Sequence, residues 1–197
     1  MKVHRMRRFF LDVNVIGEQL DVLYDIHRYY TNYRKIFELC RRLEGDASEE
    51  FFISVLNSCA MSCVMSWCLL FGNPRNSKIH WHKSAPESGA SVDGDEINNE
   101  HYKVVVRSIL EGVCAENGKI LEEYMNEMIA FRNKYAAHRD LGNYKPLPFL
   151  DVAIEIASAY MDWLGDEIFW GEPLVSLKEF EVAYEPKVDA VLKLHEK

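Results

Sequence analysis

One short segment, residues 131–139, holds several side chains that can act on a phosphate ester. It reads Phe-Arg-Asn-Lys-Tyr-Ala-Ala-His-Arg, with Arg132 and Asn133 shortly before His138. An arginine can bind phosphate through two donors of its planar guanidinium, and a histidine can transfer protons near neutral pH. Asn133 can orient the phosphate or the imidazole. The residue types of this segment are therefore compatible with binding a phosphate through Arg132 and transferring a proton through His138.

The same residues carry a resemblance to a known family. Arg132-Asn133 followed by Ala137-His138 resembles the signature of the HEPN superfamily. The upstream blocks strengthen that likeness and make the chain similar to the AbiU-type branch, which is associated with phage abortive infection. These blocks read Trp67-Cys68-Leu69-Leu70-Phe71-Gly72 and Ile79-His80-Trp81. Together the similar parts span about residues 50–170.

The resemblance implies a dimeric, metal-independent endoribonuclease in a defence or toxin role, whose two motif helices face each other in one composite site. Its expected partners are RNA, a second copy of the chain, and an antitoxin or other protein; no cofactor, metal or membrane is expected. Cleaving RNA without a metal needs a base for the 2′-hydroxyl, an acid for the leaving oxygen and positive charge for the phosphorane. The resemblance implies that the catalytic residues are Arg132 and His138. The supporting or RNA-contacting residues would then be Asn133, Lys134 and Arg139.

Ideal helix geometry places Arg132 and His138 on different faces. Six residues rotate a side chain by about 240° relative to the first, so the two lie about 120° apart around the axis. Either the helix loosens before His138, or Arg132 of one subunit works with His138 of the other.

Two other interpretations of these residues stay open. Arg132 and His138 can offset the helix dipole and bind terminal carbonyls without any catalytic role. The protein is then a non-catalytic helical interaction module that binds a protein partner or a nucleotide. A zinc site is a further alternative, built from four residues that lack the spacing of a known zinc module: Cys59, Cys63, His80 and His82.

The pattern of apolar residues predicts an all-α, up-and-down bundle. Apolar residues at helical spacing over about 9–42 indicate one helix or two in line, and Ser48-Glu49-Glu50 begins a second helix that runs through Trp67. Further helices are expected over 98–115, 119–138, 149–168 and 182–197. The long irregular loop at about 72–98 is expected to be mobile except where Ile79 and Trp81 fix it to the core.

Composition and charge favour one folded domain spanning 1–197, with a HEPN-like core over about 50–170. The net charge of −8 is unevenly spread, because residues 1–42 hold nine basic against five acidic side chains, or +4, and the rest carries −12. The chain therefore pairs a basic N-terminal helix (1–44) with an acidic C-terminal one (176–197). Its odd number of cysteines, five, favours free thiols and a cytoplasmic location.

Residues 51–71 carry no charged side chain and are long enough to span a membrane. Several serines lie among them, and no second span is present to bury those hydroxyls. We therefore expect this segment to be the most enclosed helix of the bundle.

Overall fold

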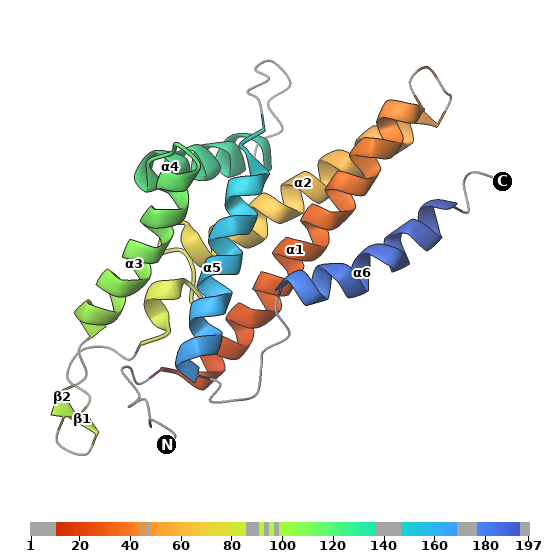
Figure 1. Ribbon diagram of the computed structural model, residues 1–197. Helices are drawn as coiled ribbons and strands as arrows, with labels where there is room; N and C mark the ends of the chain where they lie inside the picture. Colours follow the sequence, from red (N-terminus) through yellow and green to blue (C-terminus); the bar gives the residue numbers. More distant parts are fainter. Residues whose placement is uncertain are drawn as a thin grey trace.

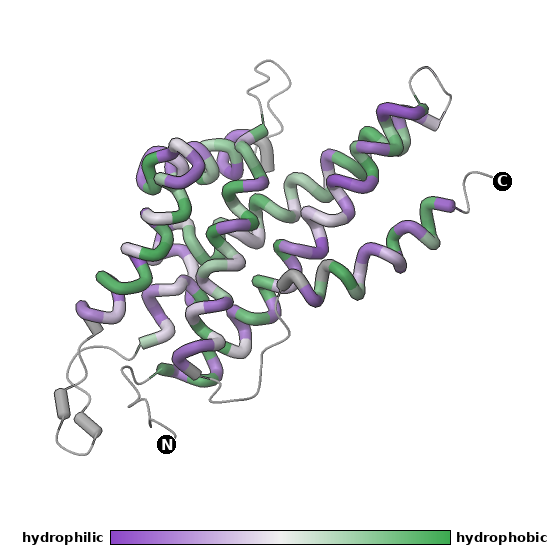
Figure 2. The backbone as a smooth tube through the Cα atoms, in the orientation of Figure 1, coloured by the Kyte–Doolittle hydropathy of each residue, from purple (hydrophilic) through white to green (hydrophobic). Residues whose placement is uncertain are grey.

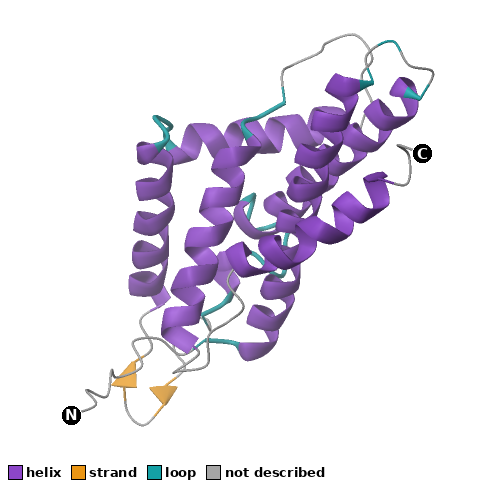
Figure 3. Ribbon diagram, turned by 45° about the vertical axis from the view of Figure 1, so that its right-hand side comes forward, coloured by secondary structure: helices purple, strands orange, loops and turns teal. Residues whose placement is uncertain are grey.

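The computed structural model describes residues 11–43, 45, 48–85, 91–92, 95–96, 99–136, 147–168 and 177–193, which are predominantly helical (Figures 1 and 3). The all-α class is confirmed. The described residues also include a two-stranded antiparallel ladder of β1 (Ser91–Val92) and β2 (Asp95–Glu96), which lies within the expected loop.

The first two helices form a long antiparallel hairpin. Helix α1 (Val13–Arg42) is one continuous helix, begun by Asp12, whose carboxylate accepts from the backbone N–H of Asn14 at 2.9 Å. Helix α2 (Glu49–Phe71) starts at the expected acidic turn and runs four residues beyond Trp67. It packs back along α1, and the hairpin extends to the upper right of Figure 1.

Three further helices complete the main body. Helix α3 (Asn99–Glu116) lies beside α5 (Leu150–Ile168), and the shorter α4 (Leu121–Phe131) contacts α2 and α3 (Figure 1). Gly118, with φ of +64°, makes the turn between α3 and α4, a backbone conformation that glycine adopts at low cost.

Aromatic rings fill the centre of this body. Trp67 of α2 meets Tyr124 of α4 edge to face, with ring centroids 5.6 Å apart. Phe71 meets Tyr160 of α5 in the same way and at the same distance. All four side chains are at most 1% exposed, so Trp67 and Phe71 of the Trp-to-Gly block identified in the sequence lie in the core, whereas Leu69 of the same block is 42% exposed.

Buried hydrogen bonds fix the segment that follows α2. Trp81, which begins the 3-10 turn η1 (Trp81–Lys83), is 4% exposed, and its carbonyl accepts from the hydroxyl of Tyr102 at 2.7 Å. The amide of Gln19 donates to the carbonyls of Ile79 and His80 at 3.1 and 3.2 Å. Trp81 is therefore the buried anchor of the loop, with the half-buried Ile79 beside it. The expected mobility of residues 86–90, 93–94 and 97–98 lies outside the described residues.

The acidic C-terminal helix packs along the first helix. Helix α6 (Leu177–Leu192) begins within one residue of the start expected for the acidic helix at 176–197, and five residues before the start at 182 that the apolar pattern gave. Phe180 packs on Tyr24 of α1 with ring centroids 5.1 Å apart. Lys35 of α1 pairs with Asp189 at 3.1 Å and with Glu185 at 3.8 Å. Residues 194–197 of the expected helix lie outside the described residues.

The expectation that α2 is the most enclosed helix is wrong. Phe51 is 61% exposed, Met65 44% and Leu69 42%, because α1 and the main body cover one side of α2 and no described element covers the other. Among the described residues α2 is also the one helix long and apolar enough to span a membrane, and 39% of its most apolar window is buried in the fold.

Candidate functional site

The motif segment begins where the α-helix gives way to a wider one. The sequence predicts helix up to His138, but α4 ends at Phe131 and residues Arg132–Ala136 form a π-helical turn, η2. A π-turn bonds each residue to the fifth rather than the fourth, and such turns are frequent at functional sites. The α-helical angle of about 120° between Arg132 and His138 therefore does not apply across this turn.

Asn133 holds the guanidinium of Arg132. The Nε and Nη2 groups of Arg132 both donate to Oδ1 of Asn133, at 3.1 and 2.9 Å. Arg132 is half-buried and Asn133 is exposed. A guanidinium has five N–H donors, so this contact uses two of them and fixes the plane of the rest. Asn133 thus orients the arginine. That it also orients a phosphate or the imidazole of His138 stays a prediction, because His138 lies outside the described residues.

The π-turn packs against the C-terminal half of α2. Burial raises the pKa of the Cys68 thiol to about 11, and the positive charge of nearby Arg132 opposes that rise. The guanidinium therefore lies beside α2, at the edge of the helix face that the main body covers. Lys134, on the same turn, is half-buried.

The remaining motif residues, His138 and Arg139, lie outside the described residues. The structure brings Arg132 and Asn133 together and gives no position for the proposed proton-transfer residue. The catalytic pair therefore stays a prediction from the sequence.

Two of the four residues of the zinc alternative, His80 and Cys63, make other hydrogen bonds. His80 accepts from the backbone N–H of His82 at Nδ1, 3.1 Å away, and its Nε2 faces the carbonyl of Gly72 at 3.0 Å. The thiol of Cys63 points to the carbonyl of Ile26 at 3.7 Å, and burial raises the pKa of Cys63 to about 12. Within the described part of the chain, no group of three or more such side chains is placed to hold a metal.

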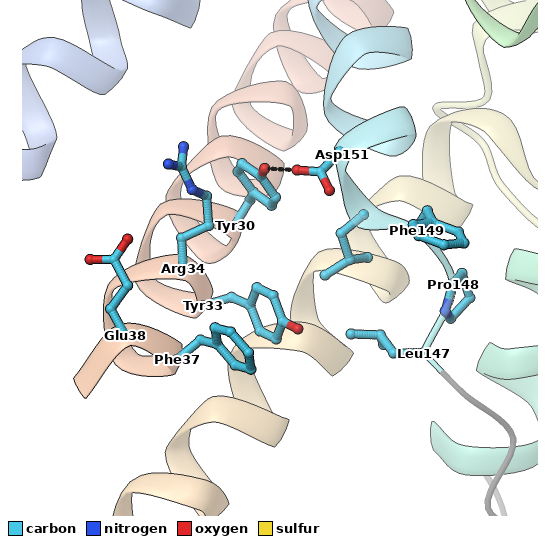
Figure 4. A pocket seen from close by; sticks show the side chains of 10 residues that line it. Tyr30, Tyr33, Arg34, Phe37, Glu38, Leu147, Pro148, Phe149 and Asp151 are labelled. Atoms are coloured by element: carbon cyan, nitrogen blue, oxygen red, sulfur yellow. Dashed lines mark hydrogen bonds between the residues drawn. The ribbon is translucent and has the colours of Figure 1, made fainter. Parts of the chain in front are cut away.

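A pocket of about 380 Å³ opens between the middle of α1 and the start of α5. Figure 4 shows Tyr33 and Phe37 of α1 on one side and Leu147, Pro148 and Phe149 on the other. The rings of Tyr33 and Phe37 lie nearly parallel, with centroids 6.2 Å apart. Because residues 147–149 come soon after the motif, the pocket lies close in sequence to the proposed RNA site.

The pocket is lined in part by polar side chains, which include charged groups of both signs. The hydroxyl of Tyr30 donates to the carboxylate of Asp151 in the first turn of α5 (Figure 4). Burial, together with that carboxylate, raises the pKa of Tyr33. The guanidinium of Arg34 lies 5.8 Å from the centre of the Tyr30 ring, and Glu38 lines the rim. The pocket therefore offers aromatic faces with both a donor and acceptors.

Sequence reasoning missed this pocket. Tyr30 is 8% exposed, whereas Arg34 and Phe37, one and two turns later on α1, are exposed. The available signal was the spacing of Tyr30, Tyr33, Arg34 and Phe37, which places all four on adjacent turns of one helix. The opposing wall comes from residues more than a hundred positions later, and no local pattern indicates that pairing.

Comparisons of this chain with known protein families, with curated proteins and with solved structures found no match.

Proposed function

We propose that this protein is a HEPN-like, dimeric, metal-independent endoribonuclease in a defence or toxin role. The observation that carries the proposal is the Arg132–Asn133 pair, in which two hydrogen bonds fix a guanidinium at the end of a bundle helix and on a π-turn. A fixed guanidinium matches the planar geometry of a phosphate better than a freely rotating one.

Each motif residue has a distinct role in the proposed reaction. Arg132 binds the phosphate and stabilises the charge of the phosphorane, while Asn133 positions the guanidinium. His138 transfers the proton from the 2′-hydroxyl or to the leaving oxygen. Lys134 and Arg139 extend the surface that contacts the RNA backbone. Product strands then end in a 2′,3′-cyclic phosphate and begin with a 5′-hydroxyl.

The test is cleavage of single-stranded RNA by the full chain in the presence of a chelator. We expect RNA to be cut and DNA to survive, because DNA lacks the attacking 2′-hydroxyl. Arg132→Ala and His138→Ala should each lower the rate by about 10²–10⁴, and Asn133→Ala by about tenfold through a misplaced guanidinium. Arg107→Ala, an exposed arginine on α3 paired with Glu111, is the matched control and should cut at the normal rate.

Mixed dimers of two variants test whether residues of both subunits form one composite site. A dimer of one Arg132→Ala chain and one His138→Ala chain should regain activity if the two residues act across subunits. Cleavage that needs a divalent metal, or that persists in the double substitution, contradicts the mechanism.

The α1–α5 pocket supports a second candidate, a nucleotide-binding module without cleavage. Its volume of about 380 Å³ lies at the small end of ligand sites, which suits a base and its sugar better than a large cofactor. A base would stack on Phe37 and hydrogen-bond to Arg34 and Glu38, since nucleobases carry donors and acceptors on one edge.

Calorimetric titration with nucleoside monophosphates tests the module directly. We expect binding that Phe37→Ala weakens about tenfold or more through lost stacking, and that Val104→Ala, on the exposed face of α3, leaves unchanged. Nucleotide binding by a wild type that does not cleave RNA favours the module. Equal affinity of Phe37→Ala and Val104→Ala for the nucleotide would mean that it binds outside the α1–α5 pocket.

A further inference from the structure

One acceptor of the α1–α5 pocket is held in place by the fold. The carboxylate of Asp151 accepts from the hydroxyl of Tyr30, a side chain that is 8% exposed (Figure 4). Asp151 also lies in the first turn of α5, so the helix and the phenol together set the direction of its oxygens. A carboxylate has about four lone-pair sites, and the bond from Tyr30 uses one of them. Asp151 can therefore accept from a ligand at a nearly fixed position.

The other charged groups of the pocket are less constrained. Arg34 and Glu38 are exposed on α1, and their long side chains have several rotatable bonds. Each can turn toward whichever edge of a base it meets, so these two residues can contribute to affinity without telling one base from another. Discrimination between bases then depends on Asp151, because a site rejects a ligand that leaves its fixed polar group unpaired.

The aromatic wall of the pocket determines how a base would lie. The rings of Tyr33 and Phe37 are nearly parallel, and Figure 4 shows them side by side on α1, below Asp151 in this view. A base that stacks on this wall turns an edge, rather than a face, toward the neighbouring groups. Burial, and then the charge of Asp151, raise the pKa of Tyr33, so the carboxylate is close enough to the wall for its charge to act there. The edge of a stacked base can thus be directed at Asp151.

We propose that the pocket selects the bases adenine and cytosine, because Asp151 accepts a hydrogen bond from their exocyclic amino group. Uracil and hypoxanthine carry a carbonyl oxygen where cytosine and adenine carry the amino group. A carbonyl oxygen opposite the carboxylate leaves two acceptors facing each other without a proton between them, and the two repel. The inference rests on the nucleotide-binding candidate above for the presence of a base in the pocket, and it adds which bases the pocket takes.

Two pairs of neutral nucleosides test this selection by calorimetric titration of the full chain. Cytidine and uridine differ mainly in an amino or a carbonyl group at one ring position, as do adenosine and inosine. None of the four has a phosphate that Arg132 could bind. We expect cytidine to bind at least tenfold more tightly than uridine, and adenosine at least tenfold more tightly than inosine, because the second member of each pair loses a hydrogen bond to a charged acceptor.

Asp151→Asn tests the carboxylate itself, because an amide has the same size and supplies a donor. Its oxygen can still accept from Tyr30, so the link between α1 and α5 is kept, while its NH2 group can donate to a carbonyl. The preference within each nucleoside pair should therefore disappear or reverse. Asp162→Asn, at an exposed aspartate on α5 outside the pocket, is the matched control and should keep the wild-type preference. Circular dichroism establishes that each variant is folded.

Tyr30→Phe tests whether the hydroxyl of Tyr30 positions the carboxylate. The aromatic ring stays in the fold, but Asp151 loses the donor that holds it. We expect the preference for cytidine over uridine to fall, with the affinity for uridine unchanged, since stacking on the aromatic wall is not altered. Tyr184→Phe removes a hydroxyl that donates to Asn32 at 3.2 Å between α6 and α1, and it should change neither affinity.

Several outcomes overturn the inference. Two of these are equal affinities within both nucleoside pairs and a folded Asp151→Asn protein that keeps the wild-type preference. A third is binding of agmatine, a guanidinium compound without a base, as tightly as cytidine and adenosine, which would make the pocket a site for organic cations. If no nucleoside binds, the nucleotide-binding candidate is rejected as well. RNA cleavage in the presence of a chelator is measured separately, and its presence or absence decides the endoribonuclease proposal without altering these affinities.

Discussion

Two buried histidines show how position sets the charge of a side chain. Burial lowers the pKa of His27 on α1 to about 4 and that of His80 to about 3. The Nδ1 of His80 accepts a backbone N–H, so the neutral ring carries its proton on Nε2 and donates to the carbonyl of Gly72. Nε2 of His27 lies 3.2 Å from the hydroxyl of Ser158 on α5. Both residues therefore serve the fold as neutral rings.

From these lowered pKa values we predict that the protein loses stability as the pH falls from about 6.5 toward 4. In that window the unfolded chain binds protons that the folded one does not, so the free energy of unfolding decreases. A fall in pKa from 6.5 to about 4 corresponds to about 3 kcal/mol for His27. Urea unfolding at several pH values should show a shallower decline for His27→Gln than for the wild type. His101→Gln, on the exposed side of α3, should decline as the wild type does, and identical slopes in all three proteins would refute the assignment.

Among the elements, the end of α2 depends on one glycine. A Cβ built on Gly72 would lie 2.5 Å from the carbonyl oxygen of Cys68, one turn earlier in the helix. The backbone N–H of Gly72 donates to that same oxygen at 3.1 Å, so the close approach is part of the helix end. The Gly72 carbonyl then accepts from His80, which ties the following segment back onto the helix. The glycine that closes the Trp-to-Gly block thus has a steric role.

We expect Gly72→Ala to lower the free energy of unfolding by about 1–3 kcal/mol, because either the helix end or the His80 contact must move. Gly112→Ala, inside α3 with open space around its Cβ position, is the matched control and should be neutral or stabilising by about 0.5–1 kcal/mol. Thermal and urea unfolding measure the free energy of unfolding of both variants. An unchanged Gly72→Ala protein would mean that the turn adapts without cost.

For the whole molecule, the first and last helices pack against each other. Residues 13–42 hold five basic and four acidic side chains, so the basic excess of residues 1–42 comes mostly from residues 1–10, which lie outside the described residues. Helix α1 and the acidic α6 lie side by side (Figure 1), joined by Lys35 with Asp189 and Glu185. Such partly exposed pairs contribute about 0.2–1 kcal/mol each, so the aromatic contact of Tyr24 with Phe180 carries more of the packing. Helix α6 thus shields part of α1.

The sequence by itself determined the elements whose causes are local. Glu49-Glu50 and Asn117-Gly118 mark helix ends because first-turn carboxylates and a left-handed glycine act on their nearest neighbours. The side chain of Ser48 makes no cap hydrogen bond to α2. The positions of α2, α3 and α5 were therefore predicted to within a few residues. Arg132 and Asn133 were both predicted as site residues, but the hydrogen bonds between them were not, since Asn133 was expected to orient a phosphate or the imidazole.

Tertiary structure decided what depends on distant residues. The uncharged stretch of α2 predicted burial on all sides, but burial requires a covering element, and the described chain supplies one for a single face. The pocket joins Tyr30 to Asp151, which lie 121 positions apart. The π-turn at Arg132 has no signature in residue type, because the packing of its ends against α2 and α4 sets the spacing of its hydrogen bonds. Local chemistry thus fixes where helices begin and end, and only the packing of helices decides which faces meet, which stay open and where a pocket forms.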